Sequence, residues 1–119
     1  ELRLVVAQIC EAHNATANVS QLMRIPAVVN NAEETDFVIA TALETAGSEN
    51  AGRIDTLPTM GAEDFAFYLE RIRGCFFFVG NGEDGAYLHH PLYDYRDEIL
   101  PVAAGMFTAI AERRLAAPR

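Results

Sequence analysis

The residue with the clearest potential for chemistry is His89, which lies in the run Leu88-His-His-Pro91. A neutral imidazole is a good ligand for zinc and similar ions at neutral pH. Catalytic zinc normally takes three protein ligands and a water, whereas this sequence offers His89 and at most a carboxylate. From the residues alone, His89 is either one ligand of a metal site or a histidine on a surface loop. His90 and His13 are weaker candidates.

Two further groups of residues could belong to a site. Glu63 and Asp64 lie in the first turn of an expected helix, where negative charge favours the helix by about 0.3–1 kcal/mol each. Gly80, Asn81 and Gly82 form a glycine turn whose spacing is not that of a phosphate-binding loop. Each group is therefore either part of a site or simply local structure. No serine or cysteine is paired with a histidine in a recognisable nucleophile motif.

The elements that must position these residues follow from hydrophobic periodicity. Helices are expected over residues 2–13, 31–47, 62–73 and 97–116, and strands over residues 18–25, 53–57 and 75–79. The second helix has the best-defined ends, with Asn31 as N-cap, Glu34 in the capping-box position and Gly47 after the last turn. Residues 75–79 are apolar on both faces, which is typical of an interior strand. The alternation of helices and strands predicts an α/β fold.

The natural break in the chain is near Asn30 and Asn31. One helix and one strand, in residues 1–30, cannot bury both of their faces. This part is therefore expected to end another unit or to pair with another chain.

Composition narrows the possible partners and location. The 119 residues are 50% hydrophobic and carry a net charge of −8, so a phosphate backbone would be repelled and nucleic acid is not expected as a partner. No apolar run approaches the ~20 residues of a membrane span. Cys10 and Cys75 lack a CxxC spacing and are expected to be buried free thiols, which suits the cytoplasm.

Three ordered motifs carry a resemblance to a known family. They are Met60-Gly-Ala-Glu-Asp-Phe65, Phe78-Val-Gly-Asn-Gly82 and Leu88-His-His-Pro-Leu-Tyr-Asp-Tyr-Arg-Asp-Glu98. In this order they resemble the C-terminal end of metal-dependent amidohydrolases of the aminoacylase/carboxypeptidase type (peptidase M20-like), which include hippurate hydrolase and the indole-acetyl-amino-acid hydrolases. The upstream Ile25-Pro-Ala-Val-Val-Asn30 is similar to that family's return strand from its lid domain.

The resemblance implies a role for each matching residue. His89 would bind one ion of a two-metal centre holding Zn, or Mn, Co or Ni, while His90 occupies a variable position. The pair Glu63 and Asp64 would lie near the site without binding the ion. The turn Gly80-Asn81-Gly82 would lie near the substrate's carboxylate.

The resemblance also implies a domain organisation. Residues 1–30 would be the last helix and strand of a lid or dimerisation domain. Residues 31–119 would be the C-terminal half of a zinc-peptidase-like αβα catalytic domain.

The family's other functional groups have no counterpart in this sequence. The histidine- and cysteine-rich metal motif, the Glu-Glu pair with the general base and the lid histidine are absent, and Glu33-Glu34 lies in the wrong place for that pair. The chain is therefore expected to be a C-terminal fragment with no catalytic residue of its own, inactive alone. It would associate with the missing N-terminal half or form a homodimer. The implied reaction is hydrolysis of N-acyl amino acids or small peptides by metal-activated water. The alternative is a non-catalytic dimerisation or binding module.

Overall fold

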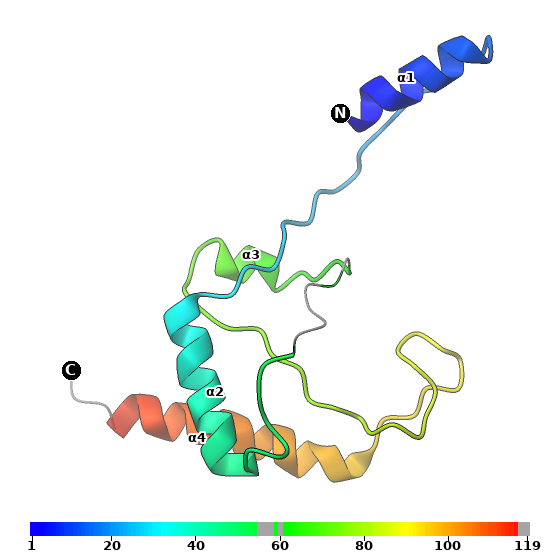
Figure 1. The fold of residues 1–119 in the computed structure, drawn as a ribbon. Coiled ribbons are helices and arrows are strands. Elements are labelled where there is room, and N and C mark those ends of the chain that lie inside the picture. The colour runs from blue at the N-terminus through cyan, green and yellow to red at the C-terminus, as the bar shows by residue number, and fades with distance from the viewer. Residues whose placement is uncertain (55–58, 60, 117–119) are drawn as a thin grey trace.

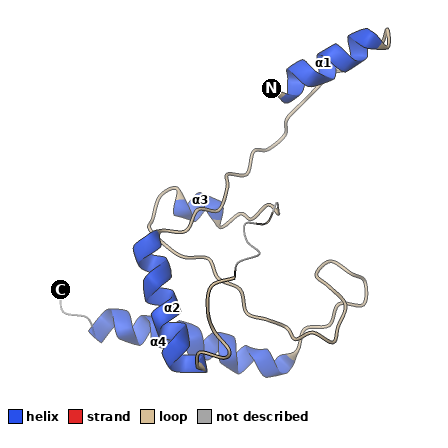
Figure 2. Ribbon diagram, in the orientation of Figure 1, coloured by secondary structure: helices blue, strands red, loops and turns tan. Residues whose placement is uncertain are grey.

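The computed structural model describes residues 1–54, 59 and 61–116 of the chain (Figure 1). Its elements, in order, are α1 (Leu2–Ala12), α2 (Ala32–Ala46), α3 (Ala66–Leu69), the 3-10 turn η1 (Asp97–Ile99) and α4 (Leu100–Ala116). Within the described residues the regular structure is helical only, as Figure 2 shows. None of these helices is both long and apolar enough to cross a membrane.

Helix α2 begins and ends as the sequence predicts. The side chain of Asn31 accepts a hydrogen bond from the Glu34 N–H at 3.1 Å, which satisfies one of the free donors of the first turn. At the other end Gly47 adopts φ 85°, and its N–H donates to the Leu43 carbonyl at 3.1 Å. The left-handed φ is the reason for a glycine at this position.

Helix α4 also confirms its prediction, with one refinement. The single turn η1 precedes it, so the first residues of the predicted helix are wound more tightly than the rest. Pro101 lies in the first turn of α4, where a missing N–H costs no helical hydrogen bond. Arg113 and Arg114 lie in the last turn, where their positive charge interacts favourably with the negative end of the helix dipole.

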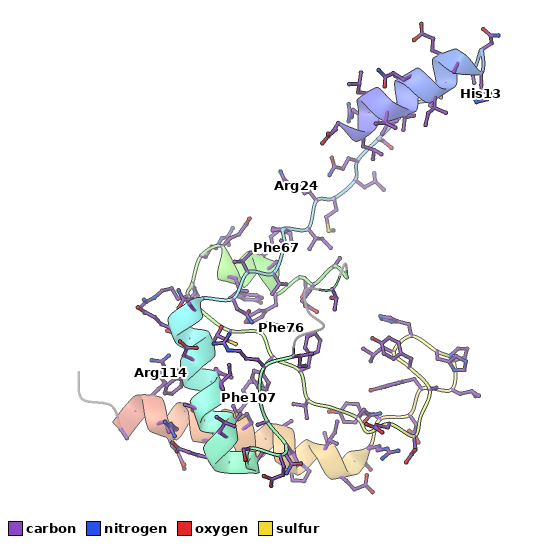
Figure 3. All side chains as sticks on the ribbon, viewed as in Figure 1. His13, Arg24, Phe67, Phe76, Phe107 and Arg114 are labelled. Atoms are coloured by element: carbon purple, nitrogen blue, oxygen red, sulfur yellow. The ribbon has the colours of Figure 1, made fainter. Side chains whose placement is uncertain are left out.

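Helices α2 and α4 pack against each other and hold most of the small core. Thr41 of α2 and Met106 of α4 are buried. Phe107 projects from α4 toward the segment that follows residue 75 (Figure 3). The centres of the Phe107 and Phe77 rings are 5.4 Å apart. Apart from these helices, Ala66 of α3 is the other buried residue in the described chain.

The helix expected over residues 62–73 is much shorter than predicted. Regular α-helix is confined to α3, and Glu63 and Asp64 lie before it rather than in its first turn. On the predicted apolar face, Tyr68 is 63% exposed and Ile72 is 67% exposed. A helix gains most of its stability by packing such a face, so the unpacked residues explain why the helix does not extend.

The strands expected over residues 18–25 and 75–79 do not form. Residues 16–29 are extended, and no backbone hydrogen bond joins them to another described segment. At Phe76 the side chain of Asn30 takes the place of a neighbouring strand: its Oδ1 accepts from the Phe76 N–H and its Nδ2 donates to the Phe76 carbonyl, both at 2.8 Å. A strand is defined by a ladder with a second backbone, and neither segment forms a ladder with another of the described residues. Most of the third predicted strand, residues 55–57, lies outside the described residues.

The fold is open. Helix α1 confirms its prediction, but it lies away from the other helices at the end of the extended segment (Figure 1). The radius of gyration is 20.2 Å, against about 13–14 Å for a compact domain of this length. The accessible surface is 10356 Å², whereas a compact monomer of this mass exposes about 6,400 Å². The described residues therefore do not close a core of their own.

Candidate metal-binding loop

The residues predicted to bind the metal and the substrate lie on one long loop, residues 80–96, which is called the histidine loop below. It leaves the segment 75–79 and returns at η1, and it projects from the rest of the fold as the yellow lobe in Figure 1. It contains the glycine turn at its start and the two histidines near its middle. The described part of the structure thus places Gly80, Asn81, Gly82 and His89 on the same loop.

The neck of the loop is closed by the side chain of Asn81. Its Nδ2 donates to the Asp94 carbonyl at 2.9 Å, and its Oδ1 accepts from the Arg96 N–H at 2.9 Å. One side-chain amide thereby joins the two ends of the loop through the kind of backbone hydrogen bonds that an adjacent β-strand would make. Both polar atoms of Asn81 are used by these bonds.

A second tie comes from the guanidinium of Arg96. Its Nη2 donates to the Asp84 carbonyl at 3.0 Å. Gly82 has φ 88°, and a Cβ built on it would lie 2.5 Å from Nη1 of Arg96. The glycine is therefore required for its backbone conformation, and a Cβ at this position would also displace the end of the Arg96 side chain.

The tip of the loop is a pair of turns around the histidines. His89 has φ 69°, in the left-handed region that histidine visits more readily than most residues. The His90 N–H donates to the Tyr87 carbonyl at 3.0 Å, and the Tyr93 N–H donates to the His90 carbonyl at 2.9 Å. The side chain of His90 also accepts from the Leu92 N–H through Nδ1 at 3.1 Å. His90 thus serves the turn, while His89 is exposed at the tip.

The donor set decides which metal chemistry the loop could support. No group of three or more His, Cys, Asp and Glu side chains with metal-binding geometry occurs among residues 1–54, 59 and 61–116. An exposed imidazole fits the role of one ligand, and a catalytic ion requires about three. By itself the loop could supply one such ligand, His89.

Glu63 and Asp64 are not gathered with His89. Glu63 is half-buried and its Oε1 accepts from the Phe65 N–H at 3.1 Å, so it serves the turn before α3. Asp64 is exposed beside it. Helix α3, which follows them, is separated from the tip of the histidine loop in Figure 1. Their predicted place near the metal stays a prediction.

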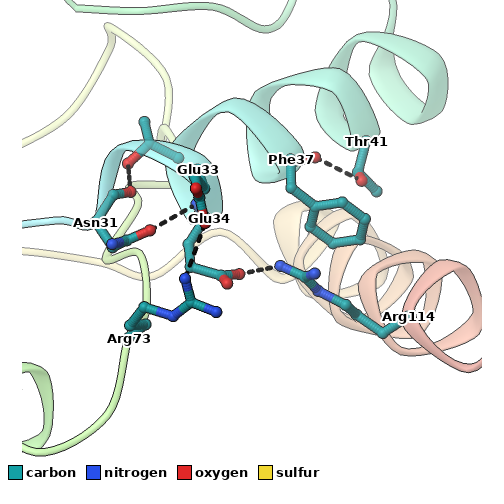
Figure 4. A network of polar contacts seen from close by, with 8 residues as sticks. Asn31, Glu33, Glu34, Phe37, Thr41, Arg73 and Arg114 are labelled. Carbon is teal, nitrogen blue, oxygen red and sulfur yellow. Dashed lines mark hydrogen bonds and ion pairs between the residues drawn. The ribbon is translucent and has the colours of Figure 1, made fainter. Parts of the chain in front are cut away.

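The acidic pair Glu33-Glu34 has a structural use. Glu33 Oε2 pairs with Arg73 Nη1 at 2.8 Å, and Glu34 pairs with Arg114 of α4 (Figure 4). The guanidinium of Arg114 also lies 3.8 Å from the ring centre of Phe37. The contacts of Arg114 join α2 to α4, and the Glu33–Arg73 pair joins α2 to the segment that follows α3.

Arg96 is the residue of this loop that sequence reasoning missed. Its partners are 12 and 15 positions away, and no local pattern links an arginine to an asparagine at that distance. The only hint in the sequence is that a glycine turn at one end of the loop is matched by a charged residue, Arg96, at the other end. The two cysteines are free, as expected, but both are half-buried rather than buried.

Most of the chain is similar in sequence to known proteins. The model of peptidase family M20/M25/M40 matches residues 4–113. A Bacillus subtilis (strain 168) protein named as an amidohydrolase, YhaA, is 36% identical over 115 residues, which are 93% of this chain and 28% of the relative. Hippurate hydrolase of Campylobacter jejuni is 30% identical over 107 residues, which are 90% of this chain and 27% of the relative.

A plant relative matches less of the chain. IAA-amino acid hydrolase ILR1-like 5 of Arabidopsis thaliana is 36% identical over 94 residues, 76% of this chain and 21% of the relative. The chain therefore spans less than a third of the length of these relatives. No solved structure gives a significant match.

Proposed function

The chain belongs to peptidase family M20/M25/M40, and on this premise we propose that it is the C-terminal part of a metal-dependent amidohydrolase. Peptidases of this family generally depend on divalent metal ions. The proposed reaction adds water across the amide bond of an N-acyl amino acid or small peptide, which gives a carboxylic acid and an amine. Relatives named hippurate hydrolase and IAA-amino acid hydrolase support this substrate class.

The observation that carries the proposal is the placement of His89. Its imidazole is exposed at the tip of a loop whose backbone is tied at both ends, in a left-handed conformation fixed by neighbouring turns. A metal ligand benefits from such a fixed position, because an ion binds best to donors that are already oriented. We propose that His89 is one ligand of a centre whose two ions are zinc, or manganese, cobalt or nickel.

Other residues of the chain would bind the substrate or support the metal site. When bound, the ions would polarise the substrate carbonyl and activate a water molecule. The backbone of Gly80 and Gly82 would face the carboxylate of the substrate, because the side chain of Asn81 is occupied within the loop. Glu63 and Asp64 would support the site without binding the ion. The general base and the remaining ligands would come from protein that is not part of this chain.

The experiment compares His89→Ala with His90→Ala in the full-length enzyme. His89→Ala is expected to lower bound metal and hydrolysis of N-acyl amino acids together, and His90→Ala to keep most of the metal. Metal content is measured by elemental analysis after dialysis. Unchanged metal content in His89→Ala would remove this residue from the site.

A second candidate function is a non-catalytic dimerisation or binding module. The large accessible surface and the open shape favour it, since both leave apolar area for a partner. The two functions differ in a simple assay. If the 119-residue chain alone released amino acid from N-acyl amino acids at an enzyme's rate, both the fragment interpretation and the module interpretation would fail.

A further inference from the structure

The neck of the histidine loop suggests roles for residues that do not themselves reach a metal. We propose that Asn81 and Arg96 are positioning residues: they close the histidine loop and thereby hold His89 where it can bind an ion. The inference rests on the proposed function of His89 and adds the means by which that ligand is oriented. It also gives Asn81 a role within the protein instead of a contact with substrate.

The geometry at Asn81 explains why an asparagine is needed. A carboxamide both donates and accepts, and here the donor reaches the Asp94 carbonyl while the acceptor receives the Arg96 N–H. An aspartate could keep only the bond from the Arg96 N–H. An alanine would keep neither bond, and the two ends of the loop would lose their direct connection.

Arg96 fixes the near side of the same neck. Its guanidinium lies against Gly82 and donates to the Asp84 carbonyl. The residue thus contributes twice, through its backbone N–H to Asn81 and through its side chain to Asp84. Together these bonds tie residues 81–84 to residues 94–96.

The tip of the loop depends on this closure. His89 has a positive φ, and a non-glycine residue keeps such a conformation only when its surroundings determine it. The turns on either side of His89 are local, and the neck holds the two ends of the loop that carries them against each other. A loop released at its neck would gain conformational freedom, and its imidazole would have to be reordered each time an ion binds.

The first test measures Zn²⁺ affinity in the metal-free full-length enzyme by competition with a chromophoric chelator. Asn81→Ala is expected to weaken Zn²⁺ binding about tenfold to a hundredfold, the range seen when groups that orient metal ligands are removed. Asn81→Asp is expected to lose less. Asn50→Ala is the matched control, because the Asn50 side chain also donates to a backbone carbonyl, that of Ala46 at 2.9 Å, but takes no part in the bonds of the neck. It should bind Zn²⁺ as the wild type does.

A second pair of variants tests the Arg96 side of the neck without altering either positioning residue. Gly82→Ala would strain the backbone at φ 88° and displace the guanidinium of Arg96, and it is expected to weaken Zn²⁺ binding in the same direction as Asn81→Ala. Gly85→Ala is its control in the same loop, since a Cβ there meets no atom within 4 Å. Amide hydrogen exchange of residues 81–96 should rise in Gly82→Ala and stay unchanged in Gly85→Ala.

The outcomes separate this inference from the proposed function. If His89→Ala loses Zn²⁺ affinity while Asn81→Ala and Gly82→Ala bind as the wild type does, His89 remains a ligand and the positioning roles are overturned. If His89→Ala itself binds Zn²⁺ normally, the proposed ligand is wrong and the positioning roles fail with it. If Asn81→Ala does not fold, the Gly82→Ala and Gly85→Ala pair decides the question.

Discussion

Asn31 shows at the scale of one residue how a side chain can start an element. Its Oδ1 accepts the Glu34 N–H, and its own N–H donates to the Gly74 carbonyl at 3.0 Å. The same residue therefore caps α2 and connects its first turn to the end of the α3 region. The reciprocal half of a capping box is missing, because the Glu34 carboxylate pairs with Arg114 instead.

Asn31→Ala should loosen the first turn of α2. Loss of an N-cap costs about 0.5–2 kcal/mol, so the Glu34 amide is expected to exchange its hydrogen about two- to thirtyfold faster. Asn31→Ser keeps an acceptor and should stay near the wild-type rate. Hydrogen exchange followed by NMR or mass spectrometry measures both variants, and equal rates in Asn31→Ala and wild type would show that the cap is energetically silent.

Residue-scale signals were predictable where both partners lie within one turn of helix. The N-cap at Asn31 and the glycine at Gly47 act on residues three and four positions away, and the sequence pattern predicts both. The Asn81–Arg96 tie spans 15 positions, and no periodicity reports such a contact in a single sequence. The same limit applies to His89, whose type and neighbours predict a ligand but not the turns that fix its φ.

At the scale of elements, segment 75–79 shows why helices were predicted better than strands. A helix satisfies its backbone within its own residues, so local pattern is sufficient for α1, α2 and α4. A strand needs a second backbone, and an apolar run such as residues 75–79 cannot specify which one. In this structure Asn30 satisfies one residue of that run, and the run forms no ladder within the part of the chain that is described.

Asn30→Ala tests whether that side chain holds the segment. The variant loses the bonds to both backbone groups of Phe76, which at about 0.5–1.5 kcal/mol per hydrogen bond amounts to about 1–3 kcal/mol of local stability. The Phe76 amide should then exchange markedly faster, with a smaller increase in Asn30→Asp, which can still accept from that N–H. Asn50→Ala serves again as a control. An unchanged rate at Phe76 in the full-length protein would show that another backbone, as in a sheet, protects this position.

The whole molecule raises the question of what covers its apolar surface. Helix α1 has an apolar stripe of Leu2, Val5 and Ile9, and Ile9 is 57% exposed. Leu22, on the extended segment, is 98% exposed. The accessible surface exceeds that of a compact monomer by about 4,000 Å², which is more than the roughly 1,000–2,500 Å² that each partner buries in a permanent interface.

The 119-residue chain on its own is therefore expected to self-associate. Sedimentation velocity over a range of concentrations should show species heavier than the 13.1 kDa monomer, because burial of apolar side chains between copies lowers the free energy. Ile9→Glu places a charge on the stripe of α1 and should shift the distribution toward monomer. Gln8→Glu adds the same charge beside the stripe and should not. A monomer at all concentrations, with a radius of gyration near 13–14 Å in X-ray scattering, would mean that the chain closes its core by itself and needs no partner.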